Sequence, residues 1–212
     1  MSAQVEANTA TQAPDGECQT PLSLAGLAAA LSNLRARPTF AELQTMLGRA
    51  EVGEAELRPY VKFRPGTYVR TRVMRNEHAE LLVLCWKPGH YTSIHDHNGS
   101  YSVIRVLSGR MHETIYDYDP ERGLCEGESH AWGPGHVTVA DIPDIHRIGN
   151  RAEGGEDMIT LHCYSPPFDV IRTYKVGSTE TGTLRPQAPR LIDADSDGED
   201  SDGEDSAGNV SE

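Results

Sequence analysis

The feature that most constrains the fold of this chain is a series of short β-type segments that starts near residue 60. The candidate strands span 67–74, 79–86, 101–107, 110–117, 136–140, 157–164 and 168–175. They are rich in Val, Ile, Thr and Tyr, and Gly, Pro, Asn and Asp separate them. Many short strands at this spacing predict a β-sandwich or barrel over residues 59–176 rather than a sheet built from βαβ units.

A helical segment is expected before this β region, over residues 21–58. Five leucines recur there at near-helical spacing: Leu22, Leu24, Leu27, Leu31 and Leu34. Thr20 is a possible cap for this first helix, and Pro21 suits its first turn. A second helix is expected to end near Gly48, and a third helical turn to start near Glu54. We expect these helices to pack on the β-rich body.

Both ends of the chain have compositions typical of disorder. Residues 1–20 contain almost no large apolar side chain, and residues 177–212 become polar and then acidic. Ser-Asp-Gly-Glu-Asp occurs twice, at 196–200 and 201–205. The spacing from Asp193 to Glu204 matches a calcium-binding loop, but no amphipathic helices flank it, so we interpret the segment as a solvated tail.

The net charge of −13 comes mostly from that tail. Residues 193–212 hold nine acidic residues and no basic ones, and the rest of the chain carries 23 acidic against 19 basic residues, a net −4. A mildly acidic body argues against nucleic-acid binding, which normally needs a basic patch. No run of 18 or more apolar residues occurs, so we expect no membrane span.

The cysteines and the N-terminal residues indicate a cytoplasmic protein. Cys18, Cys85, Cys125 and Cys163 lie far apart and form no CxxC pair. In a body of this size, such cysteines are typical of reduced thiols rather than of a disulfide framework. The first 20 residues also lack the charged start and apolar stretch of a secretory signal.

The histidines are confined to the β region, between His78 and His162. His95 and His97 flank Asp96, and residues two apart in an extended chain share a face, so both imidazoles could reach one ion while Asp96 points away. This pair lies in a longer frame, which reads Gly89, five residues, His95-x-His97, four residues, Ser102, six residues, Gly109, and later Gly135, ten residues, His146, three residues, Asn150.

That frame resembles the two motifs of the cupin superfamily. The resemblance implies a mainly β fold, the cupin double-stranded β-helix or jelly-roll barrel, with a small N-terminal helical segment. It also implies that His95, His97 and His146 are metal ligands. The chain departs from the motifs at Ser102, where a glutamate is usual, and at Asp141 and Pro143.

Without the glutamate, the expected ligand set is three neutral imidazoles. Such a set leaves the charge of a divalent ion uncompensated and about three positions of an octahedral ion open. A thiolate with an amine could fill two of them, and coordination would deprotonate the thiol. Imidazole suits iron, copper, nickel and zinc, so the ligands alone do not select the metal.

The surrounding sequence resembles cysteine dioxygenase. The stretches that carry this resemblance are Gly66–Arg70, Cys85-Trp86, Gly89–His97, His112-Glu113-Thr114 and His162–Asp169. The resemblance implies oxidation of L-cysteine to cysteine sulfinic acid by O2 at a non-haem Fe(II), and hence a role in cysteine catabolism. It also implies a monomer whose partners are these small-molecule substrates, with no nucleic acid or membrane.

By the same resemblance, Arg70 binds the substrate carboxylate. A planar guanidinium suits a carboxylate because it donates two parallel hydrogen bonds. Tyr68 shares the face of Arg70 in a strand and is also expected to contact substrate. Arg72 shares that face too, so a register in which Arg72 matters stays open.

Thr160, His162 and Tyr164 alternate with apolar residues, which places the three on one face of a strand. The resemblance implies that His162 and Tyr164 lie beside the metal as catalytic groups, that Tyr164 also contacts substrate, and that Thr160 orients His162 from behind. A chain from Thr160 through His162 would hold the Tyr164 phenol as a hydrogen-bond donor.

Two further features follow from the resemblance. Ser102 occupies the position at which animal members of the family have a cysteine that is crosslinked to the tyrosine, behind the metal ligands. We therefore expect Tyr164 to be uncrosslinked. The Ser165–Pro166 peptide bond is expected to be cis.

Three alternative functions stay open. The first is dioxygenation of another small thiol such as 3-mercaptopropionate, whose enzymes carry glutamine in place of Arg70. The others are a non-enzymatic metal-binding cupin and a zinc or manganese isomerase or hydrolase.

Overall fold

The computed structural model describes residues 20–140, 142, 144–152 and 155–192. Residues 1–19 and 193–212 lie outside this part of the chain, and with them most of the expected N-terminal disorder and the acidic tail with its calcium-like loop. Asp141 and Pro143, where the sequence departs from the second cupin motif, also lie outside it.

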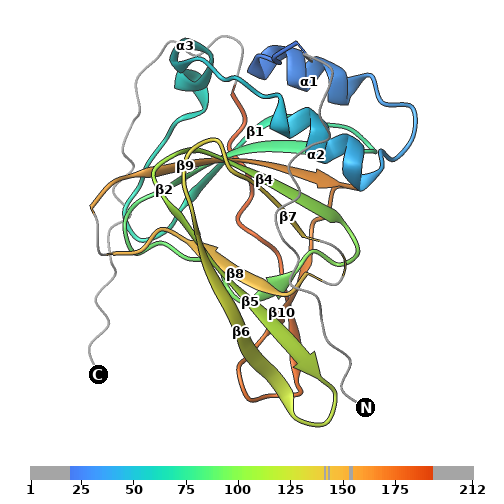
Figure 1. Ribbon diagram of the computed structural model, residues 1–212, viewed down its shortest axis with the longest axis vertical. Coiled ribbons are helices and arrows are strands. Elements are labelled where there is room, and N and C mark those ends of the chain that lie inside the picture. Colours follow the sequence, from blue (N-terminus) through green and yellow to red (C-terminus); the bar gives the residue numbers. More distant parts are fainter. Residues whose placement is uncertain (1–19, 141, 143, 153–154, 193–212) are drawn as a thin grey trace, which may run out of the picture.

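Two antiparallel sheets form the body of the protein, as the strand pattern predicts (Figure 1). The first has the order β1-β2-β9-β4-β7, with bounds Val69–Arg75, Glu80–Trp86, Met158–Ser165, Tyr101–Ser108 and Val137–Ala140. The second has the order β11-β10-β3-β8-β5-β6, with bounds Thr181–Leu184, Ile171–Tyr174, His95–Asp96, His146–Gly149, Met111–Asp119 and Gly123–Trp132. Together they form the cupin double-stranded β-helix.

Three α-helices, close to the predicted positions, and a short 3-10 helix (Arg58–Tyr60) precede the sheets. The helix α1 (Leu24–Ser32) is capped by Ser23, whose hydroxyl accepts from the Gly26 N–H, so Thr20 is not its cap. The helix α2 (Phe40–Gly48) starts with a capping box, in which Thr39 and Glu42 satisfy each other's backbone N–H groups. The short α3 (Glu54–Leu57) follows, and Figure 1 shows α1 and α2 on the outer side of the first sheet.

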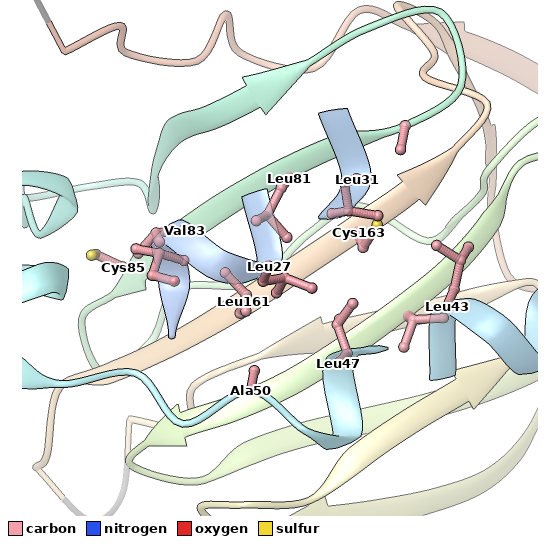
Figure 2. Close-up of a cluster of buried hydrophobic side chains, with 13 residues drawn as sticks. Leu27, Leu31, Leu43, Leu47, Ala50, Leu81, Val83, Cys85, Leu161 and Cys163 are labelled. Atoms are coloured by element: carbon pink, nitrogen blue, oxygen red, sulfur yellow. The ribbon is translucent and has the colours of Figure 1, made fainter. Parts of the chain in front are cut away.

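The interior strand β2 is buried along its whole length, because side chains on both of its faces pack against other parts of the protein. One face contacts the helices through Leu81 and Val83, and Figure 2 shows these side chains against leucines of α1 and α2. The other face, with Leu82, Leu84 and Trp86, meets residues of the second sheet. The helices therefore belong to the same folded body as the barrel.

The sequence pattern does not predict four of the strands: β3, β6, β8 and β11. Both β3 and β8 are too short to show a pattern, and β6 and β11 are largely exposed polar segments without an alternating apolar face. Their pairing is held by backbone hydrogen bonds, which leave little trace in side-chain composition.

Residues 177–192, where the composition predicts disorder, make regular contacts with the body of the protein. Strand β11 pairs with β10, and Leu184 lies opposite Ile171. Further on, the Arg190 N–H donates to the Arg70 carbonyl at 2.8 Å, and the Arg72 N–H donates to the Arg190 carbonyl at 2.8 Å. We call residues 181–190 the C-terminal strap. Backbone pairing orders this polar segment even though few of its side chains are buried.

The described residues contain no helix that is long and apolar enough to cross a membrane.

Truncating Leu31 tests whether the helices and the barrel share one core. Leu31 is fully buried, so Leu31→Ala is expected to lower the free energy of unfolding by about 2–5 kcal/mol in urea denaturation. The control Leu191→Ala removes a side chain that is 61% exposed, and should change it by less than about 0.5 kcal/mol. Equal effects of the two variants would contradict a shared core.

Candidate functional site

Three buried histidines converge between the two sheets. His95 and His146 lie opposite each other in the pairing of β3 with β8, and His97 follows the end of β3. The three ring centroids are 5.0 Å apart in every pair, and one nitrogen from each ring lies within 4.8 Å of the other two. This is the arrangement that a single metal ion bound by three imidazoles requires.

The local hydrogen bonds orient these rings. His95 Nδ1 lies 2.9 Å from the Ser93 carbonyl, which leaves its Nε2 for the space between the rings. Asp96 turns the other way, where its carboxylate accepts from the Tyr174 hydroxyl at 2.6 Å. The expectation that Asp96 points away from the histidines is therefore confirmed.

Two buried carboxylates stand behind the histidines, and sequence reasoning missed both. Glu113 accepts from His146 Nδ1 at 2.8 Å and from Trp132 Nε1 at 2.9 Å. Asp144 lies 3.1 Å from His97 Nδ1, an ion-pair distance without hydrogen-bond geometry, and 3.6 Å from His146 Nδ1. Glu113 occurs in the quoted His112-Glu113-Thr114 stretch, but its spacing alone did not indicate this contact.

The carboxylates decide the electrostatics of the histidine cluster. Burial and the neighbouring rings lower the pKa of His95 well below its usual range, so its imidazole is neutral. Burial also opposes protonation of His146, but Asp144 and Glu113 outweigh it and raise the pKa of His146 to about 9. The same contacts keep the pKa values of Glu113 and Asp144 below normal despite burial.

These residues fit a divalent cation. The Nε2 atoms of His97 and His146 are buried without a hydrogen-bond partner among the described residues, and the two carboxylates favour positive charge at this place. The interpretation of three imidazoles with no compensating charge is therefore wrong. The compensation comes through the outer ring nitrogens, a usual arrangement for histidine ligands.

A pocket of about 280 Å³ opens beside the histidines. Its lining includes Tyr68, Arg70, His95, His162, Tyr164 and Arg185. The buried Arg70 guanidinium donates from Nη1 to the Gln187 carbonyl at 2.8 Å. Arg72 is not part of the described lining and pairs instead with Glu80 at 2.8 Å, so the structure brings Arg70, not Arg72, to the pocket.

A hydrogen-bonded chain leads to Tyr164, as the one-face spacing predicts. Thr160 Oγ1 lies 2.8 Å from His162 Nε2, and His162 Nδ1 lies 2.9 Å from the Tyr164 hydroxyl. Trp86 Nε1 donates to Thr160 Oγ1 at 2.9 Å and its ring stacks on Tyr68, two contacts that sequence reasoning missed.

Trp86 gives the chain a direction. The indole can only donate, so His162 Nε2 is the one acceptor that the described residues offer the proton of the buried Thr160 hydroxyl. In the matching tautomer, with the ring proton on Nδ1, His162 donates to the Tyr164 oxygen and leaves the phenol proton for another acceptor. Burial lowers the pKa of His162 well below its usual range and raises the pKa of Tyr164, so both groups keep the neutral forms that this direction needs.

Ser102 lies directly opposite Tyr164 in the pairing of β4 with β9. Its hydroxyl is buried without a hydrogen-bond partner among the described residues. The Ser165–Pro166 bond that follows Tyr164 is cis, so that expectation is confirmed. Phe168 contacts the Tyr164 ring edge-on, with the centroids 4.7 Å apart.

Comparison with known proteins gives a consistent family. Residues 15–176 match the family model described as cysteine dioxygenase type I. The chain is 33% identical to cysteine dioxygenase type 1 of Rattus norvegicus, over 63% of this chain and 68% of the relative. It is 32% identical to cysteine dioxygenase type 1 of Danio rerio, over 68% of this chain and 74% of the relative.

A solved structure of a Klebsiella pneumoniae protein with a double-stranded β-helix domain is also similar. The TM-score is 0.45 at 18% identity, and the similarity covers 63% of this chain and 96% of that chain.

Removing the carboxylate behind His146 should weaken metal binding. Glu113→Gln loses the charge that favours a cation, so we expect metal affinity to fall about 10- to 100-fold, measured by competition with a chelator. Glu128→Gln removes an exposed carboxylate and serves as the control. Equal affinity in both variants would show that Glu113 does not support the ligand.

The intact mass should show no crosslink at Tyr164. Since Ser102 supplies no sulfur, metal-loaded protein incubated with L-cysteine and O2 should keep its full mass, with no loss of two hydrogens. Ser102→Cys places a thiol opposite Tyr164 and is the variant in which such a loss can occur. A two-hydrogen loss that maps to Tyr164 in the unmodified sequence would contradict the expectation.

Proposed function

The chain belongs to the cysteine dioxygenase type I family, and we propose that it oxidises the thiol of L-cysteine to cysteine sulfinic acid with O2. We further propose that His95, His97 and His146 hold an Fe(II) ion for this reaction. The observation that carries the proposal is the convergence, at one pocket, of the three-histidine cluster, a buried arginine and a hydrogen-bonded tyrosine.

The reaction needs no reductant besides the thiol. Both oxygen atoms of O2 are transferred to sulfur, so the electrons lost by the sulfur equal those that reduce O2. A bound iron would supply the Lewis acidity that favours the thiolate and a path for these electrons. The side chains of this protein bind the substrate, orient it and exclude water.

Arg70 would orient the substrate through its carboxylate. The Gln187 carbonyl occupies one of its Nη1 donors, which leaves the rest of the guanidinium fork for a planar anion. Because Arg70 is only 7% exposed, the ion pair would form away from bulk water, where charge-assisted hydrogen bonds are strong. Tyr68 lines the pocket beside it and is held by stacking on Trp86.

Tyr164 would donate a hydrogen bond from its phenol toward the reacting sulfur or oxygen. Its ring centroid is 5.4 Å from that of His97, so the ring lies beside the histidine cluster. The chain from Trp86 through Thr160 and His162 keeps the phenol proton directed outward. Burial raises the pKa of Tyr164, so the phenol stays protonated at neutral pH.

Other parts of the proposal follow the family and the composition. We propose that the protein is a cytoplasmic monomer acting in cysteine catabolism, without nucleic-acid or membrane partners. We also propose that residues 59–176 form the catalytic domain, on which the helical segment 21–58 packs. The main alternative is oxidation of a different small thiol such as 3-mercaptopropionate, which the buried Arg70 disfavours; a non-enzymatic metal-binding cupin is the other alternative.

Oxygen consumption tests the proposal directly. The iron-loaded protein should consume O2 with L-cysteine and yield cysteine sulfinic acid, and it should be slower with 3-mercaptopropionate. No uptake with either thiol in an iron-loaded sample would defeat both dioxygenase proposals.

Substitution of Arg70 tests how the substrate is oriented. Losing a charge-assisted hydrogen bond costs about 1.5–3 kcal/mol, so Arg70→Gln should lower kcat/KM for L-cysteine about 10- to 100-fold. The loss should be smaller for cysteamine, which has no carboxylate. Arg72→Gln, which alters the arginine paired with Glu80, is the matched control and should leave kcat/KM nearly unchanged. A similar loss with both substrates would contradict the assigned contact.

A further inference from the structure

The C-terminal strap contributes a second cation to the substrate pocket. The pocket wall includes Leu184, Arg185, Pro186 and Gln187, which all follow residue 176, where the match to the family model ends. Arg185 has no ion pair or hydrogen bond with any described residue and is exposed. This wall is therefore a feature of this chain that membership of the family does not assign.

The strap is fixed on both sides of Arg185. On one side, Leu184 pairs with Ile171 in the sheet. On the other, the Gln187 carbonyl accepts from Arg70 Nη1 at 2.8 Å, and the Arg190 N–H donates to the Arg70 carbonyl at 2.8 Å. The backbone on either side of Arg185 is thus anchored, in part to the strand that carries Arg70, and Arg185 lines the same pocket.

The charges around the pocket are of one sign. Its lining contains Arg70 and Arg185 but no aspartate or glutamate among the described residues. An ammonium group would find no carboxylate partner there, whereas a second anionic group would find a free guanidinium. Arg70 is buried and suits the carboxylate of a small thiol, so Arg185 is left without an anion when such a thiol binds.

We propose that Arg185 is a specificity-determining residue that binds a second acidic group of the substrate. The pocket then accepts small thiols with two carboxylates as well as those with one, with Arg70 holding the inner carboxylate and Arg185 the outer one. This inference rests on the proposed function for the orientation of the thiol, but it concerns binding and can be tested without turnover.

The test compares two ligands and two arginines. Mercaptosuccinate and 3-mercaptopropionate differ by one carboxylate, and Arg185→Gln and Arg190→Gln remove the same charge from the strap. Arg190 anchors the strap through its backbone and is not part of the described pocket lining. Affinities are measured by calorimetry on the metal-loaded full-length protein without O2, so a failure to oxidise cysteine does not affect the result.

Arg185→Gln should lower the affinity for mercaptosuccinate about three- to tenfold. This loss lies between the value of an exposed ion pair and that of a buried charge-assisted hydrogen bond. The same variant should change the affinity for 3-mercaptopropionate less than about twofold. Arg185→Lys should keep part of the affinity for mercaptosuccinate that Arg185→Gln loses. Arg190→Gln should leave the affinity for both ligands unchanged. The proposal is overturned if Arg185→Gln weakens both ligands equally, if Arg190→Gln has the same effect, or if mercaptosuccinate does not bind the unmodified protein.

Discussion

Burial of three imidazoles between two sheets is the constraint on which the rest of this structure depends. A buried polar group is costly unless it is hydrogen-bonded or binds an ion. Polar partners on the outer side of the rings offset this cost. The Ser93 carbonyl lies at His95 Nδ1, Glu113 accepts from His146 Nδ1, and Asp144 lies beside His97 Nδ1. The inner nitrogens lie within 4.8 Å of one another, and one cation bound between them would satisfy all three together.

The same strands that bury the histidines also arrange the substrate side. Strand β9 carries the line from Thr160 to Tyr164, and β2 beside it supplies Trp86, whose N–H sets the direction of that line. Strand β1 carries Arg70, Tyr68 lies just before its start, and the C-terminal strap pairs with β1 and holds the Arg70 guanidinium. Arg70, His162 and Tyr164 thus stand on strands, which fix side chains more firmly than loops do.

The amino-acid sequence predicts the parts of this arrangement that rest on period and spacing. Alternation along 157–164 predicts the shared face of Thr160, His162 and Tyr164, and the His95-x-His97 spacing predicts two converging rings. It cannot predict Glu113 and Asp144 as partners of the histidines, since those contacts depend on how β5 and β8 pair. It also fails for the strap, because backbone hydrogen bonds order that polar segment and composition does not record them.

Charge illustrates the same limit. The chain as a whole is acidic, yet the described pocket lining holds two arginines and no carboxylate.

The most direct test of the central claim is turnover of L-cysteine under oxygen-18 gas, with the product analysed by mass spectrometry. The account predicts cysteine sulfinic acid with both sulfinate oxygens labelled, because both atoms of one O2 are transferred to sulfur. A product with one labelled oxygen, or cystine as the only product, would contradict it.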